Sequence, residues 1–330
     1  MEDYSFSEPV VPQSLPWQRP LIDKLLTLQG DQKLPHAIII DIQSSVDSRD
    51  FAWELVSALL CQTDTDDKPC GQCQACRLMK ANNYPDFTFI TLGQNEKTQK
   101  LNKDIKIDQI RRLIHHLSLT DSLSAGKYAV IYPAEKMNLA AANSLLKTLE
   151  EPSSGVTLIL LTHHIGRLPV TIRSRCQQWT LSNPTPEQAR NWLISQSMKA
   201  NRVDDYLKLT HGDAQYAALL EQQDFVQQQS VFEKQLEDYV NDRLSAAVLA
   251  THLKTQALSS LRLLLKNKLR ALVAQCLQST LSSSDKQRLA ALLNLQRHAQ
   301  HVLQVEENNL NLQLQLEDVL ISMKQIIKRG

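Results

Sequence analysis

The sequence predicts an α/β domain with a doubly wound parallel sheet, followed by an all-helical region. Short continuous apolar runs alternate with segments of helical periodicity in residues 1–182. Parallel strands have such runs because helices cover both faces of their sheet. After residue 183 the strand-like runs give way to leucines at helical spacing. This order of elements is typical of a doubly wound domain joined to helical domains.

The first half of the α/β region predicts three helices and two strands. Pro20–Gln29 has leucines at helical spacing, and His36–Ile40 is a continuous apolar run that predicts a buried strand. Phe51–Leu60 gathers its apolar residues on one helical face. Cys73–Ala81 predicts a further helix, and Phe87–Leu92 predicts the second strand after a Tyr-Pro-Asp turn.

The second half predicts two helices and three strands. Asp108–Leu117 is amphipathic, and Tyr128–Tyr132 is a third apolar run. Leu139–Glu150 predicts a helix that a following proline ends, and Val156–Thr162 predicts the fourth strand. Arg175–Leu181 is again strand-like. These elements complete a domain that we place at residues 1–182.

Two helical domains are expected after a proline-containing break at 183–186. Thr185 is a candidate N-cap, because Pro186 and Glu187 suit the first turn of a helix. A small helical domain is expected at 183–222 and a longer helical bundle at 223–330. The leucine stripes of the bundle fit either core packing or oligomerisation, and the stripes alone do not decide between them.

Composition excludes several classes of protein. The 36 Lys and Arg residues nearly balance the 35 Asp and Glu residues, so the net charge of +1 gives no global attraction to nucleic acid. The longest apolar runs are too short to cross a bilayer. The N-terminal residues are polar and contain prolines, unlike a secretory signal. A soluble, cytoplasmic protein without membrane partners is expected.

Four cysteines predict a metal site within residues 61–76. Cys61 precedes a C-x2-C-x2-C run formed by Cys70, Cys73 and Cys76. Thiolates at this spacing can surround one tetrahedral Zn²⁺, which favours structural zinc. A redox pair, a disulfide and unligated thiols are the alternatives. The distant Cys176 and Cys276 are interpreted as ordinary reduced thiols.

The position of a phosphate-binding loop lacks the residues for that chemistry. Such a loop needs glycines, a lysine for the phosphates and a hydroxyl for Mg²⁺. The segment Asp41–Asp50, after the first strand, has neither glycine nor lysine. The third strand ends in Tyr132 and Pro133, where an acidic metal ligand is needed. We therefore expect that this site neither hydrolyses ATP nor binds it tightly. The alternative is that the domain is an unrelated α/β fold in which no nucleotide site was ever present.

Two long motifs identify a family. The segments Leu145–Pro152 (LLKTLEEP) and Leu168–Cys176 (LPVTIRSRC) closely resemble bacterial clamp-loader subunits of the AAA+ class. The cysteine module followed by Tyr84-Pro85-Asp86 resembles the zinc module of such subunits, and the opening Leu15–Gln18 also fits. The resemblance covers about residues 15–222 well. It is weaker afterwards, although Asn309–Glu317 is similar to the last helices of the family's collar domain.

The resemblance implies a fold and an assembly. It implies an AAA+ domain at 1–182, a lid domain at 183–222 and an oligomerising collar at 223–330. It also implies a hetero-pentamer with gamma/tau and delta subunits, acting on a sliding clamp and primer–template DNA within a DNA-directed DNA polymerase (nucleotidyltransferase) holoenzyme. This chain would load clamps without hydrolysing ATP itself.

The resemblance also assigns roles to single residues. Arg175, with Ser174 and Cys176 in the Ser-Arg-Cys motif, would be an arginine finger that reaches a neighbour's γ-phosphate. An ion pair with a carboxylate at the domain surface is the alternative for Arg175. Lys147 would face a neighbouring nucleotide or DNA, and a solvated lysine is equally compatible.

Thr162, His163 and His164 follow one another at the end of the fourth predicted strand. Thr162 lies at the family's nucleotide-sensor position and is expected only to pack, while His163 and His164 are interpreted as loop histidines. The rival functions are an active ATPase with an atypical phosphate loop and a zinc-dependent DNA-binding module.

Overall fold

The computed structural model describes residues 15–43, 48–65, 67–94, 102–119, 126–256, 258–278, 283–304 and 312–328. These residues form two compact units. The first comprises the described residues up to 197 together with 203–216, and the second comprises 198–202 with the described residues from 217 onwards. The division into domains at 182 and 222 is finer than these units and stays a prediction.

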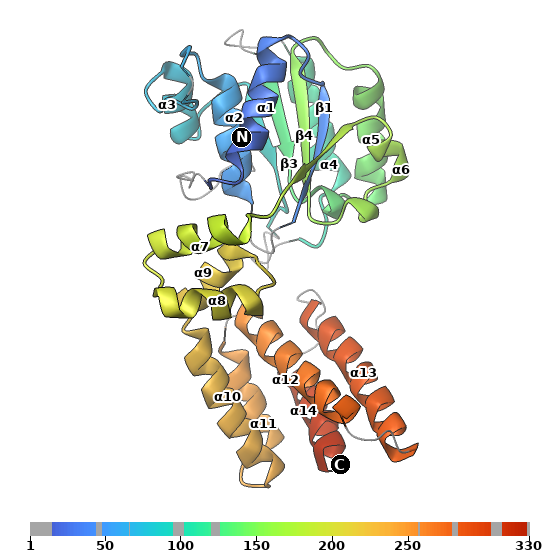
Figure 1. Ribbon diagram of the computed structural model, residues 1–330. Coiled ribbons are helices and arrows are strands. Elements are labelled where there is room, and N and C mark those ends of the chain that lie inside the picture. Colours follow the sequence, from blue (N-terminus) through green and yellow to red (C-terminus); the bar gives the residue numbers. More distant parts are fainter. Residues whose placement is uncertain are drawn as a thin grey trace. The chain divides into compact units, whose positions relative to one another are not determined.

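A five-stranded parallel sheet forms the centre of the first unit (Figure 1). Its strands are β1 (Ala37–Ile42), β2 (Phe87–Ile90), β3 (Lys127–Ile131), β4 (Val156–Thr162) and β5 (Gln177–Leu181). The order across the sheet is β2-β3-β4-β1-β5, and every neighbouring pair is parallel. The predicted parallel sheet is therefore confirmed.

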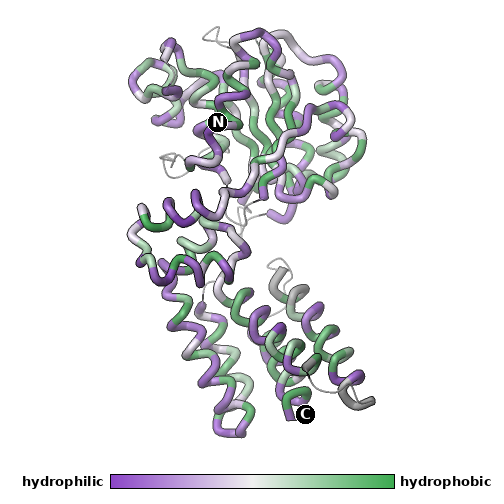
Figure 2. Tube along the Cα trace, viewed as in Figure 1, coloured by the Kyte–Doolittle hydropathy of each residue, from purple (hydrophilic) through white to green (hydrophobic). Residues whose placement is uncertain are grey.

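Helices cover both faces of this sheet. Helices α1 (Arg19–Gly30) and α2 (Arg49–Leu60) pack on one face, and α3 (Gln74–Lys80) packs against α2. Helices α4 (Ile107–Ser118), α5 (Leu139–Glu150) and α6 (Val170–Arg173) pack on the other. Because successive strand residues point to opposite faces, β1 supplies Ile38 and Ile40 to one core and Ala37 and Ile39 to the other. Figure 2 shows the strands as mainly hydrophobic, as strands buried on both faces require.

Short helices complete the first unit and lead into the second. The single-turn 3₁₀ helices are η1 (Ala134–Lys136) and η2 (Ile165–Arg167), and the longer ones are α7 (Pro186–Ser195), α8 (Ala200–Leu209) and α9 (Ala214–Gln222). The predicted cap of α7 is confirmed, because the Thr185 hydroxyl accepts the N–H of Gln188 at 3.2 Å. The Gln188 side chain accepts the N–H of Thr185 in return, at 2.9 Å.

Helices joined by short turns make up the second unit, and no strand occurs among its described residues. Its longer helices are α10 (Phe225–Val240), α11 (Ala246–Lys254), α12 (Leu258–Gln278), α13 (Ser283–Gln304) and α14 (Leu312–Lys328). Lys324 on α14 donates to Asp242, at 2.6 Å, and Lys328 also pairs with that carboxylate. The two ammonium groups lower the pKa of Asp242 to about 2. The pair therefore supports the fold above about pH 4, and this support is lost as the pH falls towards 2.

Two of the segments discussed from the sequence lie partly outside the described residues. Asn309, Leu310 and Asn311 of the collar-like motif lie outside the described residues, as do residues 44–47 of the expected phosphate loop. Among the described helices, none combines the length and the apolar character that a membrane span requires.

Leu160 provides a test of the sheet as the centre of the first unit. Leu160 lies on β4, between β1 and β3, and its side chain is fully buried in the core formed with α4, α5 and α6, so Leu160→Ala should lower the free energy of unfolding by about 2–5 kcal/mol. All four tryptophans lie in the first unit, so their fluorescence during urea unfolding reports on that unit. Leu139→Ala is the matched control, because Leu139 is 70% exposed. Equal midpoints for the two variants would contradict the assigned core.

Candidate functional site

The carboxyl edge of the sheet is where an open α/β sheet binds ligands. Here this edge is closed by Tyr132, which directly follows β3. The Tyr132 hydroxyl accepts the backbone N–H of Ser48 at 3.3 Å, and it lies 2.8 Å from Nε2 of His163, which follows β4. The rings of Tyr132 and His163 also meet edge-on, with centroids 5.6 Å apart.

Ser48 is the N-cap of α2, the helix that follows β1. Backbone N–H groups at a helix start attract anions, and this is how a phosphate loop holds its ligand. In this chain a neutral phenol oxygen binds one such N–H group. The side chains of Tyr132 and Ser48 are both buried. The N–H group at the start of α2 is thus already hydrogen-bonded to a side chain of the same protein, where a phosphate-binding loop would bind its ligand.

A second buried network lies beside Tyr132. Thr162, which is fully buried, donates its hydroxyl to Glu135 at 2.8 Å. The N–H of His163 points to the other oxygen of the same carboxylate, at 3.4 Å. Thr162 therefore packs, and it also makes a hydrogen bond that the sequence did not predict. His163 was interpreted as a loop histidine, but its ring takes part in the contact that closes the sheet edge.

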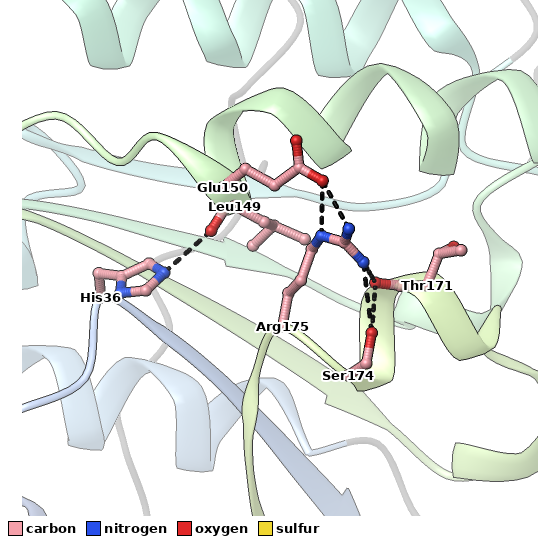
Figure 3. A network of polar contacts seen from close by, with 6 residues as sticks. All are labelled: His36, Leu149, Glu150, Thr171, Ser174 and Arg175. Carbon is pink, nitrogen blue, oxygen red and sulfur yellow. Dashed lines mark hydrogen bonds and ion pairs between the residues drawn. The ribbon is translucent and has the colours of Figure 1, made fainter.

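The opposite, amino edge of the sheet carries Arg175, just before β5. Figure 3 shows its guanidinium between the end of α5 and the end of α6. Its Nε and Nη2 atoms lie 2.8 and 2.6 Å from Oε1 of Glu150. Its Nη1 atom donates to the Thr171 carbonyl at 3.0 Å and to the Ser174 hydroxyl at 3.3 Å. The ion pair with a carboxylate, which was the alternative for Arg175 in the sequence analysis, is present and involves Glu150. The Arg175 side chain is 34% exposed.

His36 fixes the helix end that carries Glu150. Its Nε2 atom lies 3.1 Å from the carbonyl oxygen of Leu149, in the last turn of α5 (Figure 3). The carbonyl of His36 accepts the N–H of Leu158 on β4 at 2.7 Å. The end of α5 is therefore tied to the amino edge of the sheet.

The remaining residues of the two motifs have simple surroundings. Cys176, next to Arg175, is partly buried, and burial raises the pKa of its thiol to about 12. The exposed Lys147 lies on α5, one turn before Glu150. His164 is exposed, and its N–H contacts the Thr162 hydroxyl at 3.1 Å.

The four cysteines lie together, as their spacing predicts, in a cluster that can hold a metal ion. The sulfurs of Cys61, Cys70, Cys73 and Cys76 all lie within 4.8 Å of one another. Tetrahedral thiolates around one Zn²⁺ lie about 3.8 Å apart, since each Zn–S bond is about 2.3 Å. The cluster connects the end of α2, where Cys61 is the C-cap, to the first turn of α3, where Cys73 is the N-cap.

Hydrogen bonds around the cluster favour thiolates. The backbone N–H groups of Gln72 and Cys73 point to the Cys70 sulfur at 3.4 and 3.3 Å. A hydrogen bond from the Thr63 hydroxyl, together with these N–H groups, lowers the pKa of Cys70 to about 5. Burial raises the pKa of Cys76. Because bound metal requires every thiol to be deprotonated, this donor set can hold a metal ion, and its affinity should fall on acidification.

A solved structure shares the fold of this chain. The solved structure of a DNA polymerase III gamma subunit-related protein from Thermotoga maritima matches it with a TM-score of 0.51 at 20% identity, covering 91% of this chain and 98% of that chain. This similarity concerns the fold. The family model described as "DNA polymerase III, delta subunit" matches residues 17–185.

Curated relatives specify the subunit. DNA polymerase III subunit delta′ of Pseudomonas aeruginosa is 31% identical over 71% of this chain and 70% of its own length. The Escherichia coli subunit delta′ is also 31% identical, over 63% of this chain and 61% of its own length. The chain belongs to the DNA polymerase III subunit delta′ family.

Three residues at the candidate sites were not predicted from the sequence to be functional. Glu150 lies within the LLKTLEEP motif, but its partner Arg175 is 25 residues further along the chain. Tyr132 and His163 are 31 residues apart, and neither has a spacing that indicates a contact. The useful signal was that parallel strands align their ends, which brings residues that follow β3 and β4 to one edge.

Removing two ligands tests the metal cluster. We expect the double variant Cys73→Ser and Cys76→Ser to bind no zinc and to lose thermal stability in the first unit, because a structural ion contributes its binding free energy to folding. Metal content after dialysis and tryptophan fluorescence during heating are the measurements. Cys276→Ser is the control, because Cys276 lies in the second unit. Retention of one metal ion per chain by the double variant would remove this ligand set.

Proposed function

We propose that this chain is a non-hydrolysing structural subunit of the DNA polymerase III clamp loader. In this role it joins gamma/tau and delta subunits in a hetero-pentamer that places a sliding clamp on primer–template DNA. Membership of the delta′ family supports the proposal, as do the two motifs that resemble clamp-loader subunits. The second unit, with its long helices, is the part suited to a collar.

The contact of Tyr132 with Ser48 is the observation that carries the non-hydrolysing role. A bound phosphate would have to displace the phenol oxygen from the start of α2. It would receive no lysine in return, since the segment Asp41–Asp50 contains none. The acidic side chains of that segment would also repel a triphosphate. Sequence and geometry thus both disfavour nucleotide at this edge.

Arg175 is proposed to act on nucleotide bound by a neighbour. Its planar guanidinium can stabilise the charge that develops on a phosphoryl group during transfer. Its place at the amino edge, away from the closed carboxyl edge of its own sheet, supports a role between subunits. Elsewhere an arginine finger contributes about 10³–10⁵ to the rate at one site.

The cysteine cluster is proposed to hold a structural Zn²⁺. Four sulfurs leave no coordination position for a substrate, which is the arrangement of structural rather than catalytic zinc. The ion would tie the segment between α2 and α3 to the helices on either side of it. Cys61, Cys70, Cys73 and Cys76 would be its ligands.

Nucleotide affinity of the isolated chain tests the first part of the proposal. We expect no ATP binding at micromolar concentration, because both the lysine and the free helix start are missing. Isothermal titration with Mg·ATP is the measurement, and the gamma/tau ATPase subunit is the positive control. Binding of Mg·ATP at micromolar concentration would favour the alternative function, an active ATPase with an atypical phosphate loop.

Arg175→Ala tests the second part. The variant should assemble normally but lower DNA-stimulated ATP hydrolysis by the reconstituted complex, with a loss of about 10³-fold at the adjacent site. Gel filtration checks assembly, and steady-state phosphate release measures hydrolysis. Arg167→Ala is the control, because Arg167 is an exposed arginine in the nearby helix η2. Hydrolysis unchanged by Arg175→Ala would exclude the finger.

A further inference from the structure

The Arg175 guanidinium is almost fully bonded within its own chain. Nε and Nη2 both contact one oxygen of Glu150, and Nη1 contacts Thr171 and Ser174. A guanidinium has five N–H donors in a fixed plane. We call this arrangement the resting conformation of Arg175.

We propose that Glu150 is a positioning residue that holds Arg175 in the resting conformation and competes with a neighbour's phosphate for the same edge of the guanidinium. The proposal rests on the proposed action of Arg175 in trans. It adds that the finger must exchange Glu150 for phosphate before it can act.

The competition follows from the shape of the two ligands. The edge formed by Nε and Nη2 is the one that binds a carboxylate or a phosphate through two parallel hydrogen bonds. Glu150 already binds this edge at 2.8 and 2.6 Å. Two anions cannot occupy one edge, and their like charges repel each other. Engagement of phosphate by this edge therefore requires the release of Glu150.

Glu150 is held in place while the arginine is able to leave. His36 bonds to the carbonyl of Leu149 and fixes the last turn of α5, so the backbone of Glu150 is anchored. Arg175 lies in the short segment between α6 and β5, and its long side chain has several rotatable bonds. The exchange thus needs rotation of one side chain and no change in the sheet.

The exposure of the pair sets the size of the effect. The side chains of Arg175 and Glu150 are 34% and 50% exposed, so solvent screens their attraction. Pairs of this kind shift an equilibrium by about two- to five-fold. Such a bias orders the finger in the free chain, yet a more highly charged phosphate can overcome it.

The resting conformation can be tested in the isolated full-length chain, without any ATPase. Phenylglyoxal attacks the guanidinium nitrogens, and the Glu150 carboxylate covers the edge formed by Nε and Nη2. Glu150→Gln should raise the modification rate at Arg175 by about two- to five-fold, as measured by mass spectrometry of peptides. Glu151→Gln is the matched control, because Glu151 is the adjacent exposed carboxylate. An equal rate in wild type and Glu150→Gln would overturn the proposal.

The competition is tested in the reconstituted clamp loader. Glu150→Gln should raise the rate of ATP hydrolysis by about two- to five-fold, and it should have no effect when combined with Arg175→Ala. A rate that stays the same or falls in Glu150→Gln would overturn the competition. If Arg175→Ala leaves hydrolysis unchanged while Glu150→Gln still speeds modification, the proposed finger fails and the resting ion pair stands.

Discussion

The parallel pairing of β1 with β4 is the constraint on which both candidate sites depend. In a parallel sheet all strands end at one edge and begin at the other, so the two edges carry different loops. The register that aligns Ile39 with Leu160 brings the segments after β1 and β4 together at the carboxyl edge. The same register brings His36 and the end of α5 together at the amino edge.

The two edges have opposite chemical character. At the carboxyl edge, polar groups are bonded within the protein, Ser48 to Tyr132 and Thr162 to Glu135, and of these four residues only Glu135 is partly exposed. At the amino edge, Arg175 is partly exposed and charged. The core between them is the same apolar layer, so the chemistry at one edge could change without disturbing the other. This separation fits the proposed role, in which the chain binds no nucleotide itself and Arg175 acts on nucleotide bound by a neighbour.

The sequence predicts the central strands well because β1, β3 and β4 are almost entirely buried and carry continuous apolar runs, whereas the edge strand β5 is largely exposed. It also predicts the sulfur cluster, because Cys70, Cys73 and Cys76 lie within a few residues of one another. It does not predict the partner of Arg175 or that of His163. Those contacts join residues 25 and 31 positions apart, and their geometry depends on strand register and on the end of α5. Spacing in the sequence is informative only where the chain is locally regular.

The phenol at the start of α2 has a consequence for how this lineage can change. Restoring glycines and a lysine to the loop after β1 would not by itself recreate a nucleotide pocket, because the Tyr132 oxygen would still bind the helix start. Losing the tyrosine alone would leave a loop unable to hold phosphate. Neither the change in the loop nor the loss of Tyr132 would be enough by itself to allow phosphate binding. In the proposed non-hydrolysing role, both changes together would be needed before this edge could bind nucleotide.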